Sequence, residues 1–362
     1  MRIVVFGPQR RVGAWEGERI VDLNAALAGM LRDGRARGRP ETEADRRLPS
    51  SLAGFIARGA AGLDDAGAAV EYASRPDIEG GIVVSRSAVR LHAPAVDRPR
   101  IACAAGNYAE HTLGSARRMG VAASAALAGL VGPGTMPSAD EVVEKTRERG
   151  VPRGFWKDFA MPRGPDGDIP YPDRCELFDY EGEVVVVLGR SAKDVPAGRG
   201  GDYVWGVSLL NDWSIRGRST RDSLSFNLSK NFDGAASVGP SILVGQVDPA
   251  DIVVETRVNG ELRQRYRSGD MIFSHAQYVE YLSRDFVLLP GDMISGGSGP
   301  GSATDASKGA GEALSDAERA ALYLQVGDVV EVSAEGIGTL RNRVVAKDRG
   351  DDDAGPDAGG RA

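Results

Sequence analysis

The stretch that most constrains the fold runs from Phe178 to Gly189 and reads FDYEGEVVVVLG. Side chains alternate between the two faces of a strand, so Glu181 and Glu183 are expected to share one face. After Glu183 both faces are apolar, which is typical of a strand that is buried on both sides. We therefore expect the two carboxylates at the mouth of a hydrophobic core and not along a solvated edge.

Further apolar runs at short spacing predict a fold built mainly from strands. Turn signals separate the runs, including Asn259-Gly260, a strong two-residue hairpin signal. Few helices are predicted, notably over residues 138–149 and 274–283. Strands this closely spaced favour a sandwich or barrel over a parallel βαβ sheet, and the predicted class is α+β, mainly β. The predicted strands of the main domain span residues 184–188, 203–210, 253–258, 287–289, 292–295, 329–332 and 339–345.

The chain of 362 residues is long enough for two domains. Residues 1–98 are predicted to form a small β-rich domain with a turn at Glu16-Gly17-Glu18, a helix that begins at Asn24 and a surface loop over 32–47. Residues 99–346 form the main domain, and the excursion over 115–170 is of the kind that serves as an active-site lid. Residues 347–362 are expected to be a disordered tail.

Composition excludes several classes of function. The net charge of −7 and the pI of about 5.3 argue against nucleic acid as a partner. Two cysteines and three histidines exclude zinc fingers and a disulfide framework. The N-terminus has no secretory signal pattern, and no apolar run is long enough to cross a membrane. The expectation is a soluble cytoplasmic protein with reduced thiols.

A third acid joins the two glutamates at the end of another apolar run, VWGVSLLND, which ends at Asp212. Like charges this close raise the free energy of the folded state unless one acid is protonated or a cation lies between them. Three converging carboxylates without histidine or cysteine are hard oxygen ligands that suit Mg²⁺, Mn²⁺ or Ca²⁺. The alternative interpretation is that Glu181 and Glu183 form a solvated strand end and Asp212 caps a turn.

A series of short segments follows the chain over most of residues 85–346. The segments are 106–111 (GNYAEH), 179–183 (DYEGE), 210–214 (LNDWS), 229–233 (SKNFD), 258–261 (VNGE), 271–274 (MIFS), 289–292 (LPGD) and 327–332 (GDVVEV) with 335–342 (EGIGTLRN). In these segments and in their order the chain resembles the fumarylacetoacetate hydrolase family. The resemblance implies a mixed β-sandwich roll with a divalent cation, Mg²⁺ or Mn²⁺ first, held by Glu181, Glu183 and Asp212. It also implies a homodimer that acts on a small 2-oxo acid or β-diketone.

The same resemblance implies roles for individual side chains. His111 matches the family's general base, and Lys230 matches the lysine that stabilises developing negative charge. Contacts to the substrate are implied for Arg216, which suits a carboxylate, and for Ser298, Tyr108 and Lys157. The alternatives are a structural histidine, a surface arginine and a solvated lysine in the excursion.

The chain departs from the family at the position three residues after the histidine. Many members have a glutamate there that orients the base, whereas this chain has Gly114. Glu312 is the predicted replacement, with Glu141, Glu144 and Glu148 as alternatives. The segment Arg216-Gly217-Arg218-Ser219 also differs from the family pattern and predicts a different substrate pocket.

The leading hypothesis is a metal-dependent hydrolase that cleaves a carbon–carbon bond in a 2,4-dioxo acid or β-diketone. The missing orienting glutamate at Gly114 keeps open a decarboxylase, dehydratase or tautomerase of a 2-oxo acid. A non-catalytic relative of the family is a further alternative.

Overall fold

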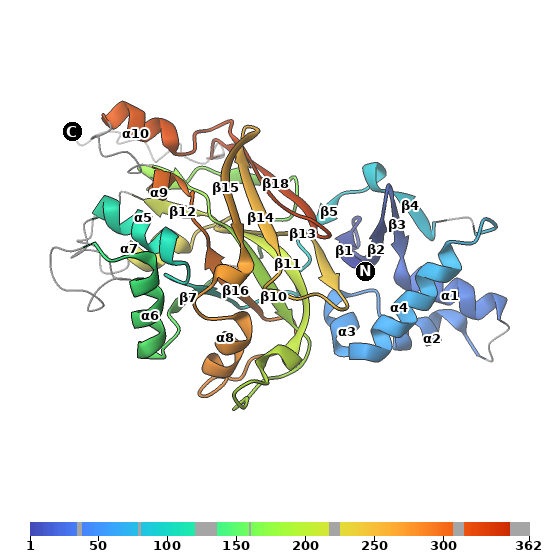
Figure 1. Cartoon of the computed structure of the whole chain (residues 1–362). Helices are drawn as coiled ribbons and strands as arrows, with labels where there is room; N and C mark the ends of the chain where they lie inside the picture. The colour runs from blue at the N-terminus through green and yellow to red at the C-terminus, as the bar shows by residue number, and fades with distance from the viewer. Residues whose placement is uncertain are drawn as a thin grey trace, which may run out of the picture.

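The protein is described here by a computed structural model that covers residues 1–34, 38–78, 81–119, 136–158, 161–216, 225–306 and 315–347. Within these ranges the chain forms a large sheet of eleven strands, a second sheet of five and a ribbon of two (Figure 1). Most neighbouring strands are antiparallel, but β16–β6 and β18–β8 are parallel pairs, so the sheets are mixed. This arrangement confirms the predicted α+β class.

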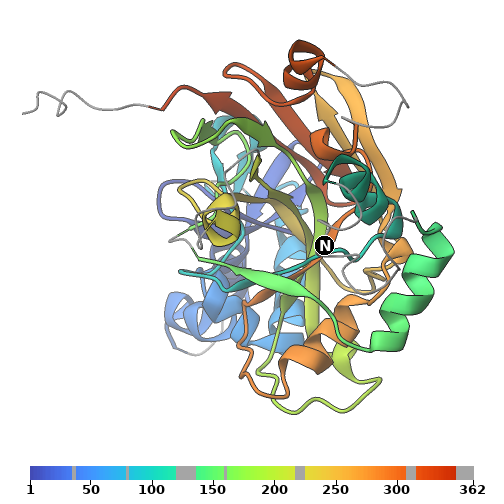
Figure 2. The same ribbon diagram turned by 90° about the vertical axis from the view of Figure 1, so that its left-hand side faces the viewer.

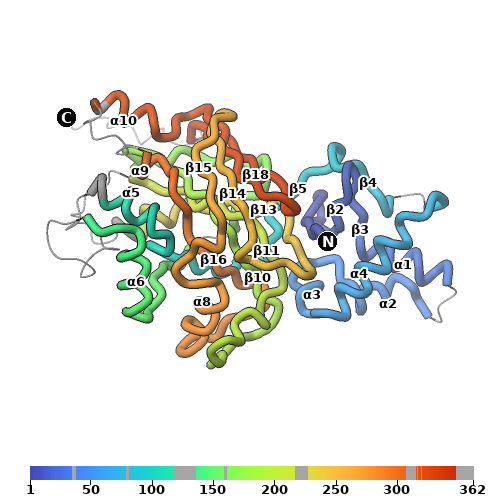
Figure 3. Tube along the Cα trace, viewed as in Figure 1, coloured from blue at the N-terminus to red at the C-terminus, as the bar shows by residue number. Residues whose placement is uncertain are grey.

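The large sheet has the order β4-β3-β2-β1-β13-β11-β10-β16-β6-β7, with β5 paired to β1. At its centre β10 lies between β11 and β16, and all of its residues are buried, as the apolar run predicts. The N-terminal strand β1 pairs with β13 of the main part, and in the Cα trace of Figure 3 the N-terminal segment lies beside the rest of the molecule. The strands are β1 (Arg2–Phe6), β2 (Arg11–Glu16), β3 (Arg19–Asp22), β4 (Val83–Ser85), β5 (Leu91–His92), β6 (Ile101–Ala104), β7 (Gly154–Lys157), β10 (Gly182–Leu188), β11 (Val204–Asp212), β13 (Ala236–Val244) and β16 (Met293–Ser298).

The second sheet packs against β10 and β11 and closes the main core. Val184 and Leu209 of the large sheet share a buried cluster with Val254 and Val332 of the second. This packing explains why β10 is apolar on both faces. The second sheet contains β15 (Glu261–Arg267), β14 (Val253–Val258), β17 (Val329–Ala334), β18 (Gly338–Val345) and β8 (Asp168–Pro170), and the ribbon pairs β9 (Leu177–Asp179) with β12 (Ser214–Arg216).

The helices lie outside the two packed sheets. Capping boxes at Ser138 and Ser274 begin α6 and α8, so both predicted helices of the main domain are confirmed. None of the helices in the described ranges combines the length and hydrophobicity needed to cross a bilayer. The helices are α1 (Leu23–Asp33), α2 (Pro40–Arg47), α3 (Leu52–Ala57), α4 (Gly59–Ala73), α5 (Ala109–Met119), α6 (Ala139–Arg149), α7 (Ser225–Lys230), α8 (His275–Leu282), α9 (Ala303–Ala306) and α10 (Asp316–Leu322).

The N-terminal strands extend the large sheet, because β1 pairs with β13 of the main part at Arg2–Leu243 and Ile3–Ile242. Helices α1 to α4 gather beside these strands (Figures 1 and 2). Phe55 of α3 packs edge to face on Trp205 of β11, with 5.4 Å between ring centroids. One hydrophobic cluster therefore joins the two parts, and the domain boundary near residue 98 stays a prediction.

Two local predictions are wrong. The surface loop predicted over residues 32–47 contains α2, where Pro40 occupies the first turn and Ala44 is buried among charged neighbours. The strand predicted over 287–289 is reduced to an isolated bridge between Leu288 and Ala192.

The excursion over residues 115–170 contributes to both sheets. Its strand β7 pairs with β6 at the edge of the large sheet, and β8 pairs with β18 in the second. Its role as a lid stays a prediction, and residues 120–135 and 159–160 lie outside the described ranges.

Candidate metal centre and active site

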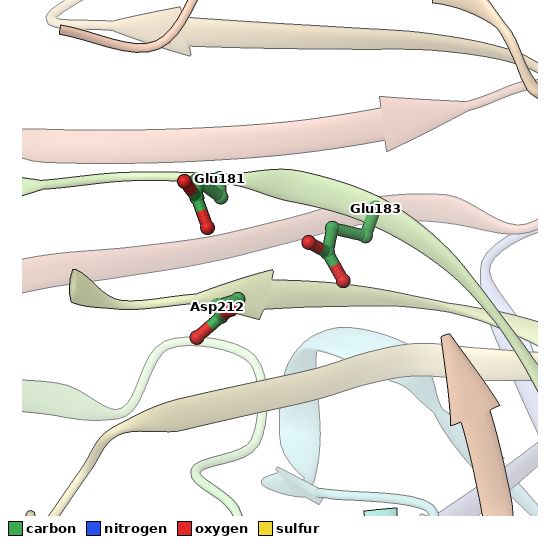
Figure 4. A group of neighbouring side chains, drawn as sticks. All are labelled: Glu181, Glu183 and Asp212. Carbon is green, nitrogen blue, oxygen red and sulfur yellow. The ribbon is translucent and has the colours of Figure 1, made fainter. Parts of the chain in front are cut away.

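Three buried acids converge at the end of the large sheet. Glu181 precedes β10, Glu183 lies on β10, and Asp212 ends the neighbouring strand β11, and the three side chains are neighbours (Figure 4). One oxygen from each lies within 4.8 Å of the others, and their exposed fractions are 5%, 1% and 1%. The interpretation of a solvated strand end is therefore wrong, and these residues could hold a divalent cation.

The strands fix where the acids stand. The Asp212 amide donates to the Glu181 carbonyl at 2.9 Å, and the Glu181 amide donates to the Asn211 side chain at 3.0 Å. Gly182 separates the two glutamates because the second sheet leaves no room for a side chain there. A Cβ on Gly182 would lie 2.2 Å from Thr256 Oγ1.

Lys230 at the end of α7 contacts two of the acids. Its ammonium donates to Asp212 Oδ2 at 2.7 Å, to Ser214 Oγ at 2.6 Å and to Glu181 Oε2. Burial opposes the charged lysine, but Asp212 and Glu181 outweigh this effect and raise the pKa of Lys230 above its ordinary value. Lys230 is therefore a fixed positive charge beside the acids.

Lys157 of β7 also enters the site. Its side chain is fully buried, pairs with Asp212 Oδ1 and donates to the carbonyls of Lys230 and Ala235 at 2.8 and 2.7 Å. The Lys157 ammonium thus has three partners within the protein, one carboxylate and two carbonyls. Contact between Lys157 and a substrate stays a prediction.

Arg216 of β12 lies at the outer side of Glu181. Its Nε donates to Asp179 Oδ2 at 3.0 Å, and another guanidinium nitrogen pairs with Glu181 Oε1. Burial raises the pKa of Glu181, but Lys230 and Arg216 outweigh it and hold that pKa well below its ordinary value. Glu181 is thus an anion in the absence of any metal.

Glu183 is the acid whose charge the protein compensates least. Among the described residues it forms no ion pair, and its hydrogen bond comes from the Ser295 hydroxyl. Burial, and after it the charges of Asp212 and Glu181, raise the pKa of Glu183 well above its ordinary value. A divalent cation would replace this repulsion with attraction, and oxygen donors suit Mg²⁺ or Mn²⁺. The residues present therefore fit the implied metal.

His111 of α5 lies beside the acids and has a carboxylate partner of its own. Its Nδ1 lies 2.8 Å from Asp305 Oδ2, and its Nε2 lies 3.7 Å from Glu181 Oε1. Burial lowers the pKa of His111, but Asp305 and Glu181 raise it to about 9. The ring is thus positively charged at neutral pH while no cation is bound to the acids.

Two other predicted side chains use their hydroxyl groups within the protein. Ser298, whose Cα pairs with that of Glu183 across the sheet, accepts from Gln264 at 2.9 Å. Tyr108 packs in the core against Tyr266 and donates to the Ser268 carbonyl at 3.2 Å. The structure brings Ser298 to the acids and gives Tyr108 a core position, so their substrate contacts stay predictions.

Sequence reasoning missed Asp305 as the partner of His111. The predicted residue Glu312 lies outside the described ranges, and the alternative Glu141 caps α6 through Ser138. A usable signal was present, since Asp305 is the first acid after the glycine-rich segment 295–301. Asp179 and Ser295, which hold Arg216 and Glu183, also went unassigned.

A cavity of about 500 Å³ opens beside the two lysines. Its wall is largely apolar and aromatic, with Phe155, Trp156 and Phe286 contributing, and Arg100 lies at its border. The Lys230 ammonium lies 5.2 Å from the centre of the Phe155 ring. The site therefore has adjoining space that could accept part of a small molecule.

Known sequences match this chain over most of its length. The family model described as Fumarylacetoacetate (FAA) hydrolase C-terminal matches residues 100–345. Oxaloacetate tautomerase YisK of Bacillus subtilis (strain 168) is 31% identical over 305 residues, which cover 82% of this chain and 87% of that protein. Protein Rv2993c of Mycobacterium tuberculosis is 32% identical over 261 residues, which cover 72% of this chain and 80% of that protein.

Solved structures share the fold. Fumarylacetoacetate hydrolase from Exiguobacterium antarcticum has a TM-score of 0.63 and 26% identity, covering 96% of this chain and 100% of its own. Maleylpyruvate hydrolase from Sphingobium sp. SYK-6, solved with manganese(II) and pyruvate, has a TM-score of 0.63 at 21% identity, with the same coverage. The second likeness concerns the fold alone.

Proposed function

The chain belongs to the fumarylacetoacetate hydrolase family, and we propose that it is a metal-dependent hydrolase that cleaves a carbon–carbon bond in a 2,4-dioxo acid or a related β-diketone. The family includes hydrolases, isomerases and a tautomerase among the relatives of this chain, so the reaction has to be argued from the site. The proposed cation is Mg²⁺ or Mn²⁺. The homodimer and the cytoplasmic location remain predictions from the sequence.

We choose hydrolysis on the basis of one observation, which is that His111 pairs with Asp305 beside the three acids. Gly114 removes the family's usual orienting acid, and without an orienter the histidine would be a poor base. Asp305, from another part of the chain, supplies an orienting acid, since its carboxylate lies 2.8 Å from His111 Nδ1. The absence of an acid at Gly114 is therefore no longer a reason to prefer a tautomerase or a decarboxylase.

The proposed reaction assigns a role to each group. A divalent cation held by the three acids would act as a Lewis acid toward the oxygens of a 1,2-dicarbonyl group. A cation at the acids would lower the proton affinity of His111. Its Nε2 would then be free to accept a proton from the water that attacks the remote carbonyl. Lys230 supplies a fixed positive charge for the enolate that leaves.

The proposal is tested with acetylpyruvate and protein loaded with Mn²⁺ or Mg²⁺ in ¹⁸O-labelled water. Hydrolysis predicts acetate and pyruvate in equal amounts, with label in the acetate carboxylate. Turnover should fall when the metal is chelated and return when it is restored. No release of pyruvate from acylpyruvates of several chain lengths would contradict the proposal.

A second candidate is a tautomerase of a 2-oxo acid, favoured by the 31% identity to oxaloacetate tautomerase YisK over 82% of this chain. The same histidine would then move a proton between carbon and oxygen without adding water. Accelerated interconversion of enol and keto oxaloacetate, with no ¹⁸O entering a carboxylate and no cleavage of acylpyruvates, would select this candidate.

A further inference from the structure

Gly114 faces Asp305 at a distance that leaves no room for a side chain. Gly114 lies on α5 and Asp305 on α9, and the two helices pack together. A Cβ on Gly114 would lie 2.7 Å from Asp305 Oδ1, 2.9 Å from its Cγ and 3.0 Å from its Cβ. The whole Asp305 side chain therefore occupies the space that any residue other than glycine would need.

The protein backbone holds the Asp305 carboxylate in place. Oδ2 accepts from the amides of Gly301 and Ser302 at 3.0 and 3.3 Å and also contacts His111 Nδ1 at 2.8 Å. Oδ1 is buried and has no hydrogen-bond partner among the described residues. The segment that follows β16 thus holds the carboxylate through two backbone amides in addition to its contact with His111.

Residues three apart on a helix lie on the same side, so an acid at position 114 would reach the His111 ring from within α5. Asp305 reaches that ring from α9, and the missing side chain of Gly114 provides the space. We propose that Asp305 is the positioning residue of His111 and that Gly114 is its steric counterpart, so that the acid of the pair lies on α9 and not on α5. The inference rests on the proposed function, because it assumes that His111 acts as the base.

The consequence for the base follows from the two ring nitrogens. When Nδ1–H donates to Asp305, the free electron pair of the neutral ring is on Nε2. Nε2 is the nitrogen that faces Glu181 at 3.7 Å and hence the metal centre. Asp305 therefore fixes both the tautomer and the direction of the base without touching the substrate.

The experiment compares Asp305→Ala, Asp305→Asn and Gly114→Ala with the parent, all loaded with Mn²⁺ and given acetylpyruvate. Asp305→Ala should lower kcat about 100-fold or more, with KM and the Mn²⁺-dependent rise in Tm close to those of the parent. Asp305→Asn can keep the bonds to the Gly301 and Ser302 amides and should lower kcat less. Gly114→Ala removes no acid from the sequence but should also lower kcat, because its Cβ displaces Asp305.

Gly67→Ala is the matched control, since nothing lies within 4 Å of a Cβ at that position of α4. It should keep parental kcat. A parental kcat in both Asp305→Ala and Gly114→Ala would overturn the proposal, as would an equal loss of kcat in Gly67→Ala.

A spectroscopic signal separates this inference from the proposed function. In the metal-free parent, the His111 Nδ1 proton shared with Asp305 should give a low-field proton resonance that His111→Gln removes. The resonance should be lost in Asp305→Ala and shifted or lost in Gly114→Ala. Its presence in a parent that is inactive toward acylpyruvates would support the pairing and contradict only the reaction. Its absence from the parent, or its persistence in Asp305→Ala, would overturn the pairing.

Discussion

Glu183 is the residue on which the metal hypothesis rests most directly. It is buried, forms no ion pair among the described residues and is repelled by Asp212 and Glu181. Glu183→Gln keeps the shape and removes the charge. The variant should lose the rise in Tm that Mn²⁺ causes in the parent, because binding stabilises only a protein that retains the site. It should also raise the Tm of the metal-free protein, since the repulsion is gone.

Differential scanning fluorimetry with and without Mn²⁺ measures both effects. Glu335→Gln, an exposed glutamate between β17 and β18, is the matched control and should respond to Mn²⁺ as the parent does. A full Mn²⁺ response in Glu183→Gln would exclude this residue from the metal centre.

At the scale of elements, the close approach of the two sheets sets the positions of the glutamates. A Cβ on Gly182 would lie 2.2 Å from Thr256 Oγ1 on β14 and 3.0 Å from a methyl group of Val332 on β17. Gly182→Ala should therefore lower the free energy of unfolding by about 1–3 kcal/mol and weaken the Mn²⁺ response, because β10 must shift. Chemical denaturation measures the first effect and Mn²⁺ titration the second. Parental stability together with a parental Mn²⁺ affinity would contradict this account of Gly182.

Helix α8 carries a buried histidine that should make the protein sensitive to acid. Burial lowers the pKa of His275 from 6.5 to about 4, although the Val184 carbonyl acts in the opposite direction. Between these values the unfolded chain binds a proton that the folded ring does not, so the free energy of unfolding falls as pH drops from 6.5 toward 4. The loss from this residue should reach about 3 kcal/mol at the acid end.

His275→Gln, which keeps an amide donor for the Val184 carbonyl, should lose less stability over the same pH range than the parent. Urea denaturation at several pH values between 4.5 and 7 measures the difference. Parallel curves for the two proteins would mean that another group causes the acid sensitivity.

The sequence predicts elements best where one local pattern decides them. The apolar run of β10 and the serine caps of α6 and α8 are such patterns, and the structure confirms all three. The helix over Pro40–Arg47 was missed because seven of its eight residues are polar, charged or proline, and its single buried alanine belongs to a cluster that only the folded chain assembles. The same limit applies to the site. Its acids could be predicted from two strands, whereas the pairing of His111 with Asp305 depends on how α5 and α9 pack.

For the whole molecule, the continuous large sheet argues for cooperative folding of the two predicted domains. β1 pairs with β13, and residues from α1 to α4 share one buried cluster with Trp205 and Val244. Calorimetry of the full chain should therefore show a single unfolding transition. Phe55→Ala, which removes the ring packed on Trp205, should lower the temperature of that whole transition. Two separate transitions, with only one shifted by Phe55→Ala, would instead indicate independent domains.

The central claim is that Glu181, Glu183 and Asp212 bind a divalent cation at which His111 works. The most direct measurement is anomalous diffraction from crystals of the protein grown with Mn²⁺. The account predicts one strong peak bounded by an oxygen of each acid. Crystals with millimolar Mn²⁺ and no peak among these carboxylates would contradict it.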